Sequence, residues 1–212
     1  MDCKQIDKPV IRISVRNMVE FLLRSGDIKS SGYIGIQGLR QGAKIHRKLQ
    51  KEMEEGYQPE VRLSYDISFD DFILTVDGIA DGIITIQDEV IIDEIKSTFT
   101  PLEMVEQQYN LLHWAQAKCY AWMYMAQEDI RDITVRLTYY NVDTYDIKQL
   151  QQNFNYEELH DFFFDLASRY ARWVRFSLGH VKQRDRSIKD LPFPFAEYRK
   201  GQRGLAAAVY RA

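Results

Sequence analysis

The sequence has few cysteines, no long apolar run and no excess of positive charge, and each absence excludes a class of protein. Cys3 and Cys119 are the only two cysteines among 212 residues. Two thiols cannot supply a four-thiolate iron–sulfur or zinc site, so we expect free thiols in a reducing compartment. No apolar run approaches the roughly 18–20 residues of a membrane span, and the first five residues lack the apolar core of a signal peptide. A cytoplasmic protein without membrane contact is therefore expected.

The charge balance limits how the chain can bind nucleic acid. The formal net charge is -3 and the sequence pI is about 5.9. Binding of a polyanion would therefore depend on local basic patches and metal ions rather than on a global field. With 45% hydrophobic residues, the chain is long enough for one domain with a sizeable core.

The hydrophobic pattern predicts a mixed α/β fold with the order helices, meander, helix, strand, helix. Residues 13–24 have apolar positions at helical spacing, with Ser14 as the N-cap and Gly26 as the stop. A second amphipathic helix is expected over 36–54. The period then changes to two, which predicts an antiparallel meander of about four strands over 61–65, 69–76, 82–86 and 90–96. Thr100 and Pro101 are expected to cap a long helix that ends near 126, followed by a strand over 132–140 and a helix over 156–180.

Three short motifs carry the chemistry. They read Gly78-x-x-Asp81, Glu94-x-Lys96 and Gln116-x-x-x-Tyr120. Cutting a phosphodiester requires neutralised charge at phosphorus and an activated water, and carboxylate-bound Mg²⁺ supplies both. Asp81 and Glu94, from neighbouring strands, are the expected metal-binding acids. Lys96 would contact the scissile phosphate, hold the attacking water and stabilise developing negative charge.

The strand period separates Glu94 from its neighbours. Glu94 and Lys96 share one face of their strand, whereas Asp93 points to the opposite face, so both acids cannot enter one site. The main-chain carbonyl of Ile95 can still face the metal. Asp77 is out of register and is interpreted as a turn acid.

Other residues have a functional and a plain structural interpretation. His46 is either a neutral imidazole ligand to a second metal or an ordinary helix residue. The basic side chains around it either contact a phosphate backbone or only keep the helix soluble; they are Arg40, Lys44, Arg47, Lys48 and Lys51. Gln116 and Tyr120 share a helix face. They either bind a metal-bound water, a phosphate or a base, or they are a buried amide and a core tyrosine.

Together with Gly42-x-x-x-His46, these motifs resemble the RecB-like branch of the PD-(D/E)XK nucleases, over roughly residues 36–140. The resemblance implies a restriction-endonuclease-like core, a mixed central β-sheet flanked by helices. It also implies one or two Mg²⁺ or Mn²⁺ ions bound by His46, Asp81, Glu94 and the Ile95 carbonyl. The catalytic residues would be Lys96, Asp81, Glu94, Gln116 and Tyr120. The iron–sulfur cluster of some relatives is not expected, because its cysteines are absent.

The flanks are similar to the start of bacterial proteins that join such a nuclease to a DinG/XPD-type helicase. The tail Phe193-Pro194-Phe195-x-x-Tyr198-Arg199-x-Gly201-Gln202 is similar to that helicase's opening motif. We therefore expect a nuclease domain over 1–188 and a linker with the truncated start of a helicase domain over 189–212. No phosphate-binding loop is present, so no ATP hydrolysis is expected. The resemblance implies a DNA exonuclease in repair or replication, acting on single-stranded or end-containing DNA beside a helicase; the alternative is an inactive DNA-binding or docking domain with the nuclease fold.

Overall fold

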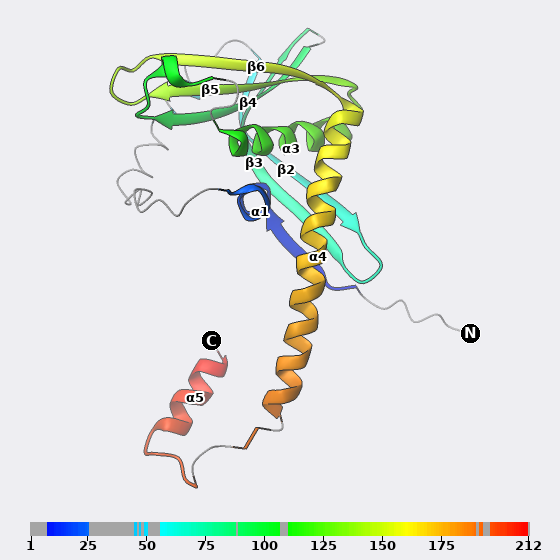
Figure 1. The fold of residues 1–212 in the computed structure, drawn as a ribbon, viewed down its shortest axis with the longest axis vertical. Helices are drawn as coiled ribbons and strands as arrows, with labels where there is room; N and C mark the ends of the chain where they lie inside the picture. Colours follow the sequence, from blue (N-terminus) through cyan, green and yellow to red (C-terminus); the bar gives the residue numbers. More distant parts are fainter. Residues whose placement is uncertain are drawn as a thin grey trace, which may run out of the picture. The chain divides into compact units, whose positions relative to one another are not determined.

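The computed structural model describes residues 8–25, 45, 47, 49–50, 56–87, 89–106, 110–189, 191–192 and 196–211. Contacts divide the chain into two compact units, Met1–Arg172 and Trp173–Ala212. Among the described helices, none combines the length and apolar character that crossing a membrane would require. The elements are β1 Val10–Ser14, α1 Val15–Leu23, β2 Tyr57–Ser68, β3 Ile73–Ile86, β4 Glu89–Thr98, the 3-10 helix η2 Leu102–Met104, α3 Leu111–Glu128, β5 Asp132–Asn141, β6 Ile147–Asn155, α4 Tyr156–Lys189 and α5 Gln202–Arg211 (Figure 1).

A mixed six-stranded sheet forms the centre of the first unit. Its strand order is β1-β3-β4-β5-β6, and β2 pairs with β3 in addition. The pairs β1–β3 and β4–β5 are parallel, whereas β2–β3, β3–β4 and β5–β6 are antiparallel. The expected mixed α/β class, a central mixed sheet flanked by helices, is therefore confirmed.

Helix α3 packs against the sheet (Figure 1) and contributes nine buried residues to the core. It contacts β2, β3, β4, β5 and α1. The Trp122 ring of α3 stacks on Phe163 of α4 at 4.3 Å between centroids and meets Tyr65 of β2 edge-on at 4.5 Å. Aromatic pairs in such arrangements add packing energy to the apolar area that they bury. One aromatic cluster thus joins α3, α4 and β2.

A separate cluster contains residues of the predicted helix over 36–54. Leu49 packs with Ile95 of β4 and Tyr140 of β5, and Ile45 lies against them. The four described residues of this segment, 45, 47, 49 and 50, are helical. His46 and the remaining residues of the predicted basic helix lie outside the described residues.

The meander differs from its prediction. A single strand, β3, runs over Ile73–Ile86 where two separate strands, over 69–76 and 82–86, were expected. Gly78 and Gly82 do not turn the chain; they make room for aromatic rings. A Cβ at Gly78 would lie 2.7 Å from the Tyr120 ring, and one at Gly82 would lie 2.0 Å from the Tyr57 ring. Asp77 is accordingly a strand residue and not a turn acid.

Helix boundaries were predicted with mixed success. Ser14 is the N-cap of α1, as predicted, and its hydroxyl accepts a hydrogen bond from the Asn17 amide. The predicted long helix exists and ends at Glu128, near the predicted 126, but its predicted start at Thr100 is wrong. Pro101 precedes only the short η2, and α3 begins after Asn110, whose side chain caps it by accepting from the Leu112 amide. The strand over 132–140 and the helix start at Tyr156 are confirmed, but α4 continues to Lys189.

Candidate active site

The candidate site lies where β1 and β4 diverge along one edge of β3. Because β2 pairs with β3 from Ile73 to Ile84, β1 and β4 must share the opposite edge. On that edge β1 pairs with Ile73–Asp77 and β4 pairs with Gly82–Ile86. The segment between them, Gly78–Asp81, faces the fork. Past Asp93, β4 pairs only with β5, which carries Glu94 and Lys96 along the other side of the fork.

Asp81 is fixed through both its side chain and its backbone. Its Oδ2 accepts a hydrogen bond from the Ile95 amide at 2.8 Å. This bond spans the fork at the point where the β3–β4 ladder has ended. The Asp81 carbonyl accepts from Gln50 Nε2 at 2.8 Å and from the Tyr57 hydroxyl at 3.3 Å. The predicted acid on β3 is therefore held beside the strand that carries Glu94.

A chain of polar contacts joins the remaining predicted residues. Lys96 Nζ donates to Glu94 Oε1 at 2.5 Å and approaches Gln116 Oε1 at 3.4 Å. Gln116 Nε2 in turn donates to the Tyr120 hydroxyl at 3.4 Å. The strand pair Glu94 and Lys96 and the helix pair Gln116 and Tyr120 thus meet, as their shared faces predict. The two longer contacts are weak hydrogen bonds.

Burial sets the protonation of the tyrosine. Glu94 is 1% exposed and Tyr120 is 3% exposed. Burial raises the pKa of Tyr120, and the nearby negative charges of Glu94 and Asp81 raise it further. Tyr120 therefore keeps its proton and can act as a hydrogen-bond donor to an anion. The Lys96 side chain is 22% exposed, so part of it reaches solvent.

Asp93 has an internal structural role. It is fully buried, and its carboxylate accepts from Arg136 Nε at 3.1 Å and Nη2 at 3.2 Å. The Thr138 hydroxyl donates to Asp93 Oδ1 at 2.6 Å. Burial raises the pKa of Asp93, although the hydrogen bonds from Arg136 and Thr138 lower it. Asp93 and Glu94, adjacent in sequence, thus belong to different environments.

Sequence reasoning missed three residues that surround the site. Tyr57 and Gln50 both bind the Asp81 carbonyl. The available signal was Gly82, since a glycine directly after the predicted acid permits the close approach of a ring. The third is His113, whose Nδ1 lies 2.9 Å from the Tyr139 hydroxyl and whose Nε2 lies 3.1 Å from Asn110 Nδ2. Tyr139 is the strand partner of Lys96, a relation that no local motif encodes.

The donor chemistry suits a hard divalent cation. Among the residues that the structure describes, no group of three or more His, Cys, Asp or Glu side chains could hold a metal ion. The described side-chain donors are Asp81 and Glu94, and each carboxylate accepts more than one interaction. Two carboxylates with a main-chain carbonyl match Mg²⁺, which prefers oxygen ligands and retains several waters. These oxygen donors differ from the cysteine and histidine ligands that structural zinc sites use.

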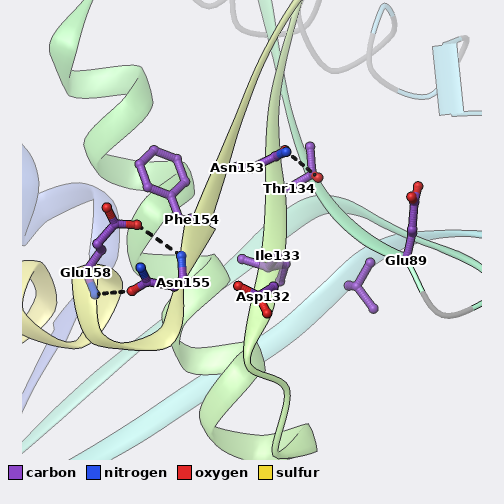
Figure 2. Close-up of a pocket in the computed structure, with 9 residues that line it drawn as sticks. Glu89, Asp132, Ile133, Thr134, Asn153, Phe154, Asn155 and Glu158 are labelled. Carbon is purple, nitrogen blue, oxygen red and sulfur yellow. Dashed lines mark hydrogen bonds between the residues drawn. The ribbon is translucent and has the colours of Figure 1, made fainter.

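A separate hollow of about 500 Å³ contains none of the predicted site residues (Figure 2). It is formed by the beginnings of β4, β5 and α4 and the end of β6. Glu158 Oε2 accepts from the Asn155 amide at 3.0 Å, and the Glu158 amide donates to Asn155 Oδ1 at 2.9 Å (Figure 2). This reciprocal pair is a capping box at the start of α4. Asn155 and Glu158 therefore serve the helix terminus, whereas Thr134 donates to Asn153 Oδ1 at 2.9 Å between β5 and β6 (Figure 2).

Comparison with known proteins gives structural likenesses only. No family model and no curated protein matches the sequence. The crystal structure of LHK-Exo in complex with dAMP is similar with a TM-score of 0.51 and 12% identity, over 83% of this chain and 94% of that chain. SSO0001 gives a TM-score of 0.46 and 17% identity, over 74% of this chain and 75% of that chain. A phage-related exonuclease from Haemophilus somnus 129PT gives a TM-score of 0.38 and 12% identity, over 79% of this chain and 82% of that chain. The likeness to LHK-Exo shows a shared fold.

Proposed function

We propose that the protein is a metal-dependent deoxyribonuclease of the exonuclease type. The observation that carries this proposal is the fork in the sheet, where the Asp81 carboxylate accepts from the amide of Ile95, the residue after Glu94, and Lys96 joins Glu94 to Gln116. An acid pair, an ammonium group and a helix amide at one opening form a set suited to phosphodiester hydrolysis. A structural ion pair alone would not require the amide and the tyrosine beside it.

The residues have separable roles in this proposal. Asp81, Glu94 and the Ile95 carbonyl would hold Mg²⁺ or Mn²⁺, and His46 is a further candidate ligand. The bound ion would supply Lewis-acid stabilisation of the phosphate and a more acidic water. Lys96 would hold the scissile phosphate and stabilise the negative charge that grows on it. Gln116 and Tyr120 would orient the phosphate by donating hydrogen bonds.

The substrate and the cellular setting belong to the same proposal. LHK-Exo was solved in complex with dAMP, and the shared fold supports DNA as the substrate. Resemblance of the C-terminal tail to a helicase opening motif supports a role beside a helicase, in repair or replication of DNA in the cytoplasm. A helicase would present single-stranded ends, which we propose as the substrate.

The test is cleavage of end-labelled single- and double-stranded DNA in Mg²⁺, Mn²⁺ or EDTA. Asp81→Ala and Lys96→Ala should each lower the rate by at least about a hundredfold, because each removes a charge that acts on the transition state. Asp129→Asn is the matched control, since Asp129 is an exposed acid outside the fork. Calorimetric Mn²⁺ titration should show that Lys96→Ala still binds metal and that Asp81→Ala binds it more weakly.

Two outcomes would count against the proposal. Cleavage that persists in Lys96→Ala would mean that the activity comes from a contaminant or another site. Absence of cleavage by the wild type in every metal, with DNA binding retained, would favour the inactive DNA-binding domain.

A further inference from the structure

A groove of about 790 Å³ begins at the candidate site and crosses β3. Gln116 and Tyr120 line its inner end, and both belong to the polar chain that reaches Lys96. The groove then passes over Gly78 and Ile79 toward β1 on one side and β2 on the other. The site therefore opens into a groove whose volume lies in the range of ligand-binding clefts.

Three arginines from three elements line this groove. Arg12 is on β1, Arg16 is in the first turn of α1 and Arg62 is on β2. The strand register explains the convergence of Arg12 and Arg62, because Arg12 pairs with Thr75 and Arg62 with Ile79 on the two edges of β3. Thr75 and Ile79 are four residues apart, so they share a face of the strand. Residues that pair directly lie on one face of a sheet. The fold thus gathers positive charge locally in a chain whose net charge is -3.

The charges of Arg12 and Arg62 are available to a ligand. All three arginines are exposed. Arg16 Nε donates to Glu20 at 2.9 Å, which partly neutralises it. For Arg12 and Arg62 the part of the chain that the structure describes provides no ion pair or side-chain hydrogen bond. One acid, Asp77, lines the groove between them.

We infer that this groove binds the phosphate backbone of single-stranded DNA and directs the strand to the candidate site. The inference rests on the proposed function, because it identifies where the substrate of that site lies. Arg12 and Arg62 bind phosphates on either side of β3, and Arg16 adds a weaker third contact. Ile79, which is 45% exposed, offers an apolar surface to sugar or base beside these charges. A basic groove with apolar or aromatic surfaces is the usual design for a single strand.

Fluorescence anisotropy with a labelled oligothymidylate tests this inference. Binding is measured in EDTA across a salt series, and a gel verifies that the strand stays intact. Arg12→Gln and Arg62→Gln should each weaken binding about fivefold at 0.1 M salt and reduce the salt-dependence slope by about 0.7, the value for one phosphate contact on a single strand. Asp77→Asn should have the opposite effect on the affinity and tighten binding roughly two- to fivefold, because it removes a negative charge from the groove. Thermal unfolding of each variant should match the parent, because the substituted side chains lie at the surface or in the open groove.

The matched control is Arg131→Gln, an exposed arginine of the same unit that does not line the groove. It should leave the affinity and the slope unchanged. Equal losses in Arg131→Gln, Arg12→Gln and Arg62→Gln would overturn the inference, as would an unchanged affinity in the groove variants. Displacement of DNA by polyglutamate of equal charge at equal concentration would also overturn it.

The two proposals fail separately in these experiments. A protein that binds single-stranded DNA through Arg12 and Arg62 but never cleaves it refutes the nuclease and supports the groove. A protein that cleaves DNA while Arg12→Gln and Arg62→Gln bind normally supports the nuclease and overturns the groove.

Discussion

Two adjacent acids, Asp93 and Glu94, show how one residue step changes a side chain's task. Glu94 lies beside Lys96 at the fork, whereas Asp93 lies inside the sheet with Arg136 and Thr138. Alternation of side chains along a strand is the physical reason for the difference. A motif that contains both acids can therefore contribute one to chemistry and one to stability.

This separation predicts opposite phenotypes for neighbouring substitutions. Asp93→Asn should lower the free energy of unfolding by roughly 3 kcal/mol, because it leaves the buried Arg136 guanidinium without its carboxylate partner. Urea denaturation followed by circular dichroism measures the change. Asp129→Asn removes the acid of the exposed Asp129–Arg131 pair, and its effect should stay below about 1 kcal/mol. If Asp93→Asn were as stable as the parent but inactive, Asp93 would belong to the catalytic site instead.

At the scale of elements, the sequence predicted those helix and strand boundaries whose signal lies within a few residues of the boundary. The Ser14 cap, strand β5 and the start of α4 at Tyr156 each have a signal within a few residues. Long-range packing decided the rest. Gly78 was placed between two predicted strands and Gly82 at the start of the second, but both lie within β3, where their missing side chains admit the rings of Tyr120 and Tyr57 from distant elements.

Strands with little apolar alternation were also missed. β6 alternates between exposed and half-buried residues and contains no buried one, and its sequence is rich in glutamine. β1 was not predicted, because its last two residues, Ile13 and Ser14, were assigned to the start of the first helix. The spacing of the three motifs predicted which candidate residues share a face. The contribution of Tyr57, Gln50 and His113 depends on pairing between elements and was not predictable from spacing.

The contact between α3 and β5 predicts an acid-sensitive stability. Asn110 caps α3 with Oδ1, so its Nδ2 donates to His113 Nε2, and Nδ1–H then donates to the Tyr139 hydroxyl. Burial, with the positive charges of Lys96 and Arg16, lowers the pKa of His113 to about 3. The folded protein therefore keeps His113 neutral, while the unfolded chain takes up a proton below about pH 6.5. This contribution to stability is complete above pH 6.5 and is lost as the pH falls toward 3.

The measurement is the free energy of unfolding at pH 7, 6.5, 5.5 and 4.5. The parent should lose roughly 1–2 kcal/mol more than His113→Asn between pH 6.5 and 4.5, since each pH unit is worth at most about 1.4 kcal/mol for one proton. His180→Asn, in the exposed part of α4, serves as the control and should follow the parent. Parallel curves for the parent and His113→Asn would show that His113 is not the group that titrates.

At the scale of the whole molecule, α4 belongs to both units. The contact boundary lies between Arg172 and Trp173, inside this helix. The sequence-based boundary at 188/189, drawn from the proline-containing segment that follows, remains a prediction about the chain's organisation. The boundary at 172/173 reflects where the packing contacts of the first unit end, whereas the boundary at 188/189 reflects where the helical sequence pattern ends.

The packing boundary predicts a gradient of protection along a single helix. The first half of α4 buries Leu159, Phe163, Leu166, Ala167 and Ala171. Past the boundary, Trp173 is 45% exposed, Phe176 62% and Ile188 57%. A helical segment without tertiary packing is marginal in water, so its amides should open locally rather than with the whole unit. Hydrogen exchange of the full chain should therefore show protection in 159–171 at least about a hundredfold above that in 176–189, with α3 as the internal reference. Uniform protection along α4 would mean that the apolar side chains beyond Arg172 are covered in solution, which would make the second half of the helix part of an interface.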